Sequence, residues 1–569
     1  MTAPRVRTTG PTAARAGRAE EELGVHEPQL APLLRRELPR AADVVSRRLL
    51  AAALREGLVQ TAGVSVGRHG FDRLEPTEPV PGDPARLLDR LAGRSVPAVR
   101  EELADAATNL ALALARRSTV DRELLVRARE TGAADLVQLT EGMAADERTV
   151  VFERLATEGH NLHPCGRTRI GWRVDDLLAH DLESPVTSVA FLAVRRDLHV
   201  GDDVAAELLG EEVGPDPARY VVTPVHPWQR RHVLRGRYAD LVADGALVPL
   251  DLELPALVTS ALRTLLVLGT GRFVKLSLDI QVTSSRRTIS VASTRNGPTL
   301  SRLLPDLLAD DRVLLMPETA GSAVVVPGDP GRQRDLAAIV RSGLTLAPGE
   351  VAVPGAALPC IDPISGTSVL AGLVRRFAAT RGIPDPVRAA SVFLGEYARL
   401  LLAPTLGLAT RHGIALEAHL QNCLPTFVDG APHRLAVRDF AGMRIHAPRL
   451  ARRTEEIPPL WPGSVIVTEK LDVMRAKIAY TALQAHLGEV VLSLGESHAL
   501  DEASAWTTVR SIVDEIYDDL AVPQARADHA FLTAPTVPHK ALLSMRLRAV
   551  AGEPGDHYVA VANPLAAPR

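Results

Sequence analysis

Acidic, imidazole and amide side chains alternate along the segment ALEAHLQN. In a strand, Glu417, His419 and Gln421 would lie on one face, and Asn422 would follow where the strand ends. Asp439 comes after a hairpin turn that we predict at the sequence DGAP. Two carboxylates and an amide oxygen suit a Mg²⁺ ion that carries the phosphates of a nucleotide. The pattern therefore predicts a magnesium site, with an ordinary polar hairpin as the alternative.

A second segment with chemical potential is KLSLDIQVTSSRRTIS, which begins at Lys275. Its alternation of polar and apolar residues predicts one strand, followed by Thr283, Arg286 and Arg287. Lysine and arginine at these positions could pair with phosphate and carboxylate oxygens, arginine through a two-pronged contact. The alternative is a half-solvated edge strand, which charged residues commonly protect. Function is favoured because lysine is rare here: the only four, at 275, 470, 477 and 540, stand among 65 basic residues.

The segment GHNLHPCGRTR gathers two histidines and two arginines. A zinc site at His160 and His163 would need further ligands, and Arg167 and Arg169 would oppose a cation, so anion binding fits better. Cys165 could be a nucleophile beside His163, but a buried cysteine is more often a small apolar filler.

The elements that must position these segments divide the chain into four parts. We predict an unstructured tail over 1–24, a helical part over 25–150, a mixed sheet with helices over 151–365, and a C-terminal part over 366–569. In the last part, one helix ends at Gly413, a strand and a hairpin follow, and helices then return. The sequence therefore predicts an α+β fold.

Composition excludes several classes of protein. A chain of 569 residues is long enough for several domains, and its formal net charge of −3 lacks the concentrated basic field that nucleic acid or an anionic membrane requires. The three cysteines are too few and too scattered for a disulfide framework. The N-terminal residues lack the apolar run of a signal peptide, and LPALVTSALRTLLVLGTG is too short and too polar to span a bilayer. We expect a cytoplasmic protein without a nucleic-acid or membrane partner.

Seven segments in this order resemble the IucA/IucC family, the siderophore synthetases that work without a nonribosomal peptide synthetase. They extend from residue 159 to residue 547, roughly two thirds of the chain, and read GHNLHPCGRTRIGW, VTPVHPWQ, TSALRT, KLSLDIQVTSSRRTIS, LEAHLQN, RDFAG and HKALLSMRL. The resemblance implies a fold likened to a cupped hand, with 25–150 as the thumb, 151–365 as the fingers and 366–569 as the palm. It also implies a distantly kinase-like arrangement of the metal site and a homodimer.

The resemblance further implies an ATP-dependent acid–amine ligase. Such an enzyme activates a carboxylate, typically of citrate, as an acyl-adenylate with release of pyrophosphate. It then transfers the acyl group to an amine, a hydroxylamine or an alcohol. ATP and Mg²⁺ are therefore expected, with a small carboxylate and a small nucleophile as partners; citrate, a monoamide of a dicarboxylic acid and 2-oxoglutarate remain open as the acid.

Site roles are carried over from the family position by position. The implied catalytic residues are Arg287, His419 and Lys275. The implied ATP contacts are His163, Arg167, Ser260, Arg263, Thr264, Lys275 and Arg287. The implied contacts to the carboxylate substrate are Thr283, Arg287, His419, Gln421 and Lys540, and the implied metal ligands are Glu417, Asn422 and Asp439. Arg167 stands where we expect a lysine, and the adjacent Arg286 and Arg287 leave open which of them contacts the substrate.

Two other functions compete with this interpretation. The spacing of Glu417, Asn422 and Asp439 is also similar to that of small-molecule kinases of the aminoglycoside phosphotransferase type, which would produce ADP. Against such a kinase stand the missing GxGxxG loop near the start and a Glu at the position of the catalytic Asp. A protein that binds a carboxylate or a ferric siderophore without turnover would bind citrate and leave ATP intact.

Overall fold

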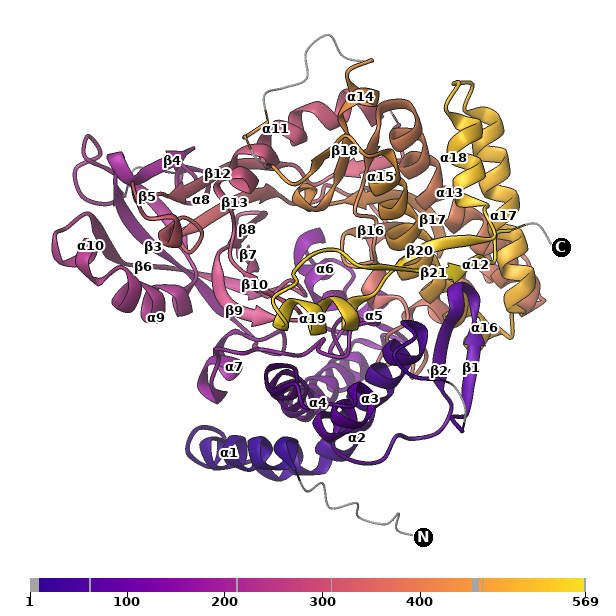
Figure 1. Ribbon diagram of the computed structural model, residues 1–569, viewed down its shortest axis with the longest axis horizontal. Coiled ribbons are helices and arrows are strands. Elements are labelled where there is room, and N and C mark those ends of the chain that lie inside the picture. Colours follow the sequence, from indigo (N-terminus) through magenta and orange to yellow (C-terminus); the bar gives the residue numbers. More distant parts are fainter. Residues whose placement is uncertain are drawn as a thin grey trace.

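The computed structural model describes residues 10–60, 63–210, 213–308, 310–452, 460–462 and 464–566. It is a mixed fold of helices and sheets. Figure 1 shows the largest sheet at the left, most of the C-terminal helices at the right, and the N-terminal helices along the bottom. The C-terminal segment runs back across the molecule, so that α19 (Leu542–Val550) packs on the N-terminal helices.

Helices dominate the N-terminal part. They are α1 (Pro11–His26), α2 (Leu30–Arg55), α3 (Pro84–Ala92), α4 (Pro97–Thr131), α5 (Leu136–Leu139), α6 (Ala145–Glu153) and, after the histidine segment, α7 (Val174–His180). A hairpin of β1 (Val66–His69) and β2 (Arg73–Pro76) interrupts them.

Helix α1 corrects the prediction of an unstructured tail over residues 1–24. The helix begins at Pro11, and Ala16, Ala19 and Leu23 lie on its buried face, which packs against α2 and α4. Two of these three residues are alanines, so the hydrophobic period is weak in the sequence although the face is fully covered in the fold. Residues 1–9 lie outside the described residues.

An eight-stranded antiparallel sheet forms the middle of the chain. In spatial order its strands are β4 (His199–Gly201), β12 (Glu318–Val324), β13 (Ala337–Ser342), β8 (Arg272–Leu276), β7 (Thr264–Val267), β6 (Leu247–Val258), β3 (Thr187–Arg195) and β5 (Tyr220–Val225). The helices inserted between them are α8 (Ala206–Leu209), α9 (Pro227–Arg237), α10 (Ala239–Ala243) and α11 (Val291–Leu308). The apolar stretch weighed as a membrane span contributes the end of β6 and all of β7.

The strand predicted from Lys275 onward is broken in two. β8 ends at Leu276, and β9 (Leu278–Val282) leaves the sheet to pair with β10 (Ser285–Arg287). The break lies at Ser277, whose hydroxyl donates to the Arg334 carbonyl at 2.7 Å and accepts from the Ile289 amide at 3.0 Å. These two bonds redirect the chain after β8 and bring β9 and β10 beside the sheet.

Smaller sheets and long helices make up the C-terminal part. A four-stranded sheet has the order β11 (Val313–Leu315), β17 (Ala431–Val437), β16 (Cys423–Val428) and β14 (Glu350–Ala352). The other strands are β15 (Ile414–Ala415), β18 (Arg444–His446), β19 (Val467–Thr468), β20 (Thr536–Lys540) and β21 (Tyr558–Ala562). The helices are α12 (Val369–Arg381), α13 (Pro386–His412), α14 (Ala447–Leu450), α15 (Leu471–Ile478), the π-helix η6 (Ala479–Leu487), α16 (Gly488–His498), α17 (Glu502–Asp519) and α18 (Ala525–Leu532).

Two of the predictions for this part are confirmed and one is wrong. Helix α13 ends before Gly413, which adopts a left-handed φ of 73°, and the hairpin turn lies at Asp429–Gly430 between β16 and β17. The predicted strand over Glu417–Gln421 is instead a loop that turns between β15 and β16, where the His419 carbonyl accepts from the Asn422 amide at 3.0 Å.

The hydrophobic core has two main parts, and α4 reaches both. Leu110 of α4 packs with the large sheet, whereas Ala128 near its end packs with the C-terminal helices. Among the described residues, one helix, α13, is long and apolar enough to cross a membrane, but 72% of its most apolar window is buried inside the protein. Burial of this kind is typical of a core helix.

Candidate functional site

Lys275 lies at the centre of the candidate site. It is buried in β8 opposite Thr264 of β7, and its Nζ lies 2.5 Å from Asp439 Oδ1. Asp439 has a left-handed φ of 64° and begins the short helix η5 (Phe440–Gly442). Burial opposes ionisation of Asp439, but Lys275, Arg263 and Arg341 hold the pKa of its carboxyl well below the ordinary value. An ion pair therefore joins the large sheet to the C-terminal half.

A second lysine–carboxylate pair lies beside the first. Lys477 of α15 donates to Glu417 Oε1. A Cβ at Gly442 would lie 1.7 Å from Glu417 Oε2, so this carboxylate lies directly against the turn that Asp439 begins. Burial opposes its ionisation, but the charge and the hydrogen bond of Lys477 lower the pKa of Glu417. Two ionised carboxylates thus lie at the same turn: Asp439 begins it, and Glu417 contacts it from another loop.

His419 lies next to this carboxylate in a defined tautomer. Its Nδ1 accepts from the Gln421 amide at 3.2 Å, which leaves the proton of the neutral ring on Nε2. Nε2 lies 3.9 Å from Glu417 Oε2. Burial lowers the pKa of His419 despite the opposing charge of Glu417, so the ring is available as a neutral donor.

The hairpin of β9 and β10 presents the arginine predicted to bind both substrates. Arg287 Nη2 donates to Thr283 Oγ1 at 2.8 Å, and burial lowers the pKa of Arg287 to about 10. Arg286 is exposed and pairs with Asp279. The geometry thus separates the two neighbouring arginines, with Arg287 beside Thr283 and Arg286 paired with Asp279. Arg263 completes the hairpin, because its Nη1 donates to the Arg287 carbonyl at 2.6 Å.

The histidine segment contacts the same hairpin. His163 is buried, its Nδ1 accepts from the Cys165 amide at 3.0 Å, and its Nε2 lies 2.6 Å from Ser284 Oγ. The neutral ring therefore donates to Ser284. Cys165 is buried, and burial raises the pKa of its thiol, as expected for an apolar filler rather than a nucleophile.

A chain of polar contacts connects Gln421 with Ser260. Gln421 Nε2 donates to Ser260 Oγ at 3.4 Å, and the Ser260 amide donates to Glu153 at 2.6 Å. Glu153 pairs in turn with the buried Arg438, which donates to the Gln421 carbonyl at 3.0 Å. The structure thus brings these two predicted residues together from opposite halves of the chain.

The predicted metal ligands fit a nucleotide-bound Mg²⁺ ion. Asn422 is buried and its backbone lies beside that of Asp439, because its carbonyl accepts from the amide of Arg438, the residue before Asp439, at 3.1 Å. In the described part of the chain no three His, Cys, Asp or Glu side chains are grouped as a metal cage. A Mg²⁺ ion on a nucleotide needs only one or two protein carboxylates, and Glu417 and Asp439 supply two ionised ones.

Arg167 corrects one predicted ATP contact. Its side chain is only 2% exposed, and Nη2 lies 2.9 Å from both Asp181 Oδ2 and Glu183 Oε2. Arg167 therefore belongs to a buried ion-pair network and not to the group around Lys275. Lys540, by contrast, lies at the edge of that group: it pairs with Asp556 at 3.0 Å, and its charge contributes to lowering the pKa of Lys477, after burial.

Sequence reasoning missed three charged residues of the site, of which two are buried and Lys477 is partly buried. Lys477 carried a signal, since it is one of only four lysines, but its helix gave no motif. Glu318 and Arg341 lie on β12 and β13, at positions that pair with each other in the sheet. Burial raises the pKa of Glu318 to about 7, although Lys275 opposes this rise, and its Oε2 has no hydrogen-bond partner among the described residues.

Comparisons with known proteins show which families and relatives this chain resembles. Residues 148–359 match the IucA / IucC family, and residues 391–554 match a second family described as ferric iron reductase FhuF-like transporter. D-ornithine–citrate ligase of Staphylococcus aureus is 24% identical over 88% of this chain and 84% of its own length. The chain is thus similar to members of the IucA/IucC family, through this match and through the citrate ligase.

Solved structures of similar fold extend the match over nearly the whole chain. The petrobactin biosynthesis protein AsbB from Bacillus anthracis superposes with a TM-score of 0.74 at 18% identity and covers 98% of each chain. The ATP-bound aerobactin synthetase IucA from Klebsiella pneumoniae superposes with a TM-score of 0.72 at 20% identity, over 92% of this chain and 100% of its own. The IucA/IucC fold thus includes both halves that meet at Lys275 and Asp439.

Proposed function

We propose that this protein is an ATP-dependent siderophore synthetase that adenylates citrate or a related di- or tricarboxylate and condenses it with an amine, a hydroxylamine or an alcohol. The observation that carries the proposal is the meeting of Lys275 and Asp439 from the two halves of the chain, beside Glu417 and Lys477. The family relationship supports it, since one relative is named for joining D-ornithine to citrate and a structure of similar fold binds ATP. The phosphotransferase interpretation is not favoured, because these relatives are ligases and synthetases.

In the first half-reaction, an oxygen of the substrate carboxylate attacks the α-phosphorus of ATP. The bond from that phosphorus to the pyrophosphate oxygen breaks, and pyrophosphate leaves with the electron pair. Two anions must approach each other, so positioning and charge neutralisation supply most of the catalysis. Lys275, Arg263 and Arg287, with His163, Ser260 and Thr264, would hold ATP.

The substrate carboxylate would bind on the other side of Arg287. Thr283, His419 and Gln421 would orient it, with Lys540 at the edge of the site. Glu417, Asn422 and Asp439 would hold Mg²⁺, which supplies charge neutralisation at the phosphates when bound.

In the second half-reaction, the nitrogen or oxygen of the nucleophile attacks the acyl carbon of the adenylate. The bond from that carbon to the phosphate oxygen breaks, AMP leaves with the electron pair, and the nucleophile loses one proton to solvent. The product is an amide or an ester.

We also infer that the N-terminal helices, the large sheet and the C-terminal half correspond to the thumb, fingers and palm of a cupped hand, with a kinase-like metal site in the palm. The enzyme would act in the cytoplasm as a homodimer. Sedimentation of the purified protein at several concentrations tests the dimer, and a single monomeric species would contradict it.

The nucleotide product tests the proposed function directly. Purified protein would be mixed with ATP, Mg²⁺, one acid from a panel of citrate, succinyl-amines and 2-oxoglutarate, and excess hydroxylamine. We expect AMP and a hydroxamate of one acid, detected by chromatography and mass spectrometry. ADP would point to a kinase, and intact ATP with bound citrate would point to a binding protein; either result contradicts the proposal.

A further inference from the structure

A cavity of about 330 Å³ lies beside the candidate site, and none of the residues assigned above to ATP, Mg²⁺ or the substrate carboxylate lines it. Its walls come from α2, from β2, from the loop that carries Asn161 and Leu162, and from His539 and Leu542 around the start of α19. This volume falls in the range of small-molecule sites. The cavity brings the first and last parts of the chain together around one space.

Most of the charges around this cavity are already paired. Arg48 pairs with Glu158 at 2.8 Å, and Arg73 pairs with Glu489 at 2.6 Å. Glu56 accepts from two backbone amides at the start of α19. These contacts leave the acidic groups of the cavity satisfied.

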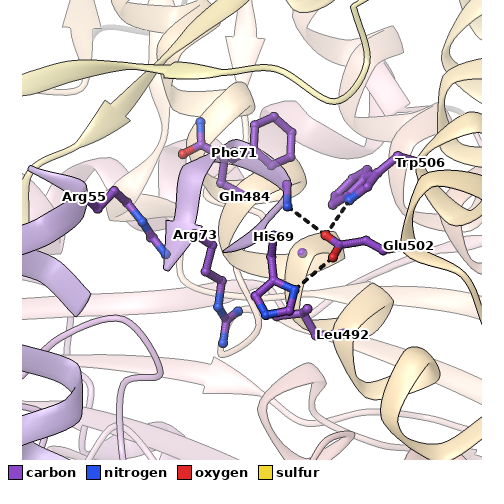
Figure 2. A pocket seen from close by; sticks show the side chains of 10 residues that line it. Arg55, His69, Phe71, Arg73, Gln484, Leu492, Glu502 and Trp506 are labelled. Atoms are coloured by element: carbon purple, nitrogen blue, oxygen red, sulfur yellow. Dashed lines mark hydrogen bonds and ion pairs between the residues drawn. The ribbon is translucent and has the colours of Figure 1, made fainter. Parts of the chain in front are cut away.

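Two arginines of the cavity, Arg47 and Arg55, have no carboxylate partner within the described residues; Arg47 donates to the Pro76 carbonyl at 2.6 Å, and of the two it is Arg55 whose pKa burial shifts. Its Nε donates to the Asp72 carbonyl at 3.2 Å. Burial lowers the pKa of Arg55 to about 10, so the guanidinium remains charged at neutral pH. Arg55 also lines a neighbouring pocket, which Figure 2 shows. There the Glu502 carboxylate is hydrogen-bonded to His69 and Trp506, and the Arg55 guanidinium lies outside that group. A desolvated cation with free donors is a site for an anion of the ligand.

The cavity adjoins the adenylation site through the histidine segment. Asn161 and Leu162 line the cavity, whereas His163 contacts Ser284 in the turn before Arg287. His160 is exposed in this segment, and its ring centroid lies 6.1 Å from that of His163.

Strand β20 and the π-helix η6 make a second connection. His539 lines the cavity, and the next residue, Lys540, lies near Lys477 at the other site. The Tyr480 ring packs edge-on against His539 at 5.5 Å. Its buried hydroxyl has no hydrogen-bond partner among the described residues. Short π-helical stretches within a longer helix are frequently found at functional sites.

We propose that this cavity binds the nucleophile of the second half-reaction, and that this nucleophile is an amine that also carries a carboxylate, with its carboxylate on Arg55 and its amine directed past His160. The inference rests on the proposed function, because the amine must meet an acyl-adenylate. The amine lone pair forms the bond to the acyl carbon, the carbon–oxygen bond to AMP breaks, and the amine proton passes to solvent. The free carboxylate is unchanged in the product.

Matched pairs of amines test the proposal with the wild-type enzyme. Ornithine is compared with 1,4-diaminobutane, 2,3-diaminopropionate with ethylenediamine, and serine with ethanolamine, each pair differing by one carboxylate. Condensation is followed as AMP release at saturating ATP and acid. We expect kcat/KM to be higher for the carboxylate-bearing member of the preferred pair. A preference for the member without a carboxylate would overturn the proposal.

Substitution of Arg55 tests whether this residue causes the preference for carboxylate-bearing amines. Arg55→Gln should lower kcat/KM for the preferred amino acid by about 10- to 100-fold, the range of a charged hydrogen-bonded contact. ATP–pyrophosphate exchange and hydroxamate formation with hydroxylamine should stay unchanged, since neither needs the carboxylate contact. Arg55→Lys, which keeps the charge, should lose less, and Arg68→Gln, at an exposed position on β1, should lose nothing.

The outcomes separate this inference from the proposed function. An equal loss of all three activities in a folded Arg55→Gln protein would overturn the inference, because it would make Arg55 a structural residue. Absence of exchange with every acid in the wild type would overturn the proposed function, and the inference with it. If Arg55→Gln does not fold, the wild-type pairs and Arg55→Lys decide.

Discussion

Arg287 is the residue whose charge the adenylation step needs most directly, since it can contact both anions. We expect Arg287→Ala to lower ATP–pyrophosphate exchange by at least about 100-fold through loss of a two-pronged, partly desolvated contact. Arg286→Ala is the matched control, because Arg286 is exposed and its ion pair, with Asp279, lies outside the group around Lys275. A larger loss in Arg286→Ala would reverse the assignment of the two arginines.

The pH dependence of the same activity follows from the burial of Arg287. Burial lowers the pKa of Arg287 to about 10, so its guanidinium loses charge as the pH rises through that value. The exchange rate of the wild type should therefore fall as the pH rises through about 10, measured with short incubations. Exchange that persists well above this pH would show that the charge is not required.

Glu318 gives a prediction for stability. Burial raises its pKa from an ordinary value of 4.5 to about 7 in the folded state, so the unfolded chain ionises first and stability falls as the pH rises between these values. Glu318→Gln keeps the shape without the charge and should stabilise the protein by up to about 3 kcal/mol above pH 7.5. At pH 4.5 the difference should be small. Denaturant unfolding at both pH values measures it, and a variant less stable at high pH would contradict the assignment.

Single site residues were predictable from the sequence where they belong to a short motif of functional residue types. Lys275, Asp439 and Arg287 were named from their segments, and the structure brings Lys275 and Asp439 into contact. Arg167 failed because its partners, Asp181 and Glu183, lie in a loop whose return to the histidine segment has no local signal. Lys477 was missed because only tertiary packing brings its helix beside Glu417.

Among the elements, the turn at η5 leaves room for the Glu417 carboxylate because Gly442 has no side chain. Gly442→Ala would place a methyl group against Glu417 Oε2 and displace that carboxylate from the turn. We expect the Mg²⁺ concentration for half-maximal exchange to rise by at least about 10-fold. Gly407→Ala in α13 is the control, because its nearest contact, at 3.7 Å, is the end of a flexible arginine side chain. Unchanged Mg²⁺ dependence in Gly442→Ala would remove Glu417 from the metal site.

Element boundaries were harder to predict than element types. The long helices α12 and α13 follow from their apolar period and their glycine ends, whereas the alternation of Glu417, His419 and Gln421 mimics a strand and is a loop. In that loop the backbone amides donate hydrogen bonds to carbonyls of the same loop and to Nδ1 of His419. The alternation of polar and apolar residues therefore reflects the placement of functional side chains and not the pairing of a strand. Helix α1 shows the reverse error, because small residues bury a face without a strong hydrophobic signal.

At the scale of the whole molecule, the C-terminal segment fastens the two ends of the chain together. Arg546 of α19 makes a two-pronged contact with Glu102 of α4, and Glu102 is only 2% exposed. Removal of one partner would leave the other charge buried without compensation, which is costly. Strand β20, with His539 and Lys540, lies directly before α19 in the chain, so we expect its position to depend on this attachment as well as on its pairing with β21.

Arg546→Ala should therefore destabilise the protein by about 2–4 kcal/mol, less than a fully buried pair because Arg546 is partly exposed. Arg548→Ala, two residues further along the same helix, removes an exposed partner of Glu553 and should cost less than about 0.5 kcal/mol. The difference between the two variants in denaturant unfolding measures the attachment. Because α19 carries no predicted contact to ATP, exchange in folded Arg546→Ala should persist while condensation with the amine weakens. Equal stability of the two variants would show that the C-terminal segment is held by its apolar contacts alone, and that the ion pair with Glu102 contributes specificity of position and not free energy.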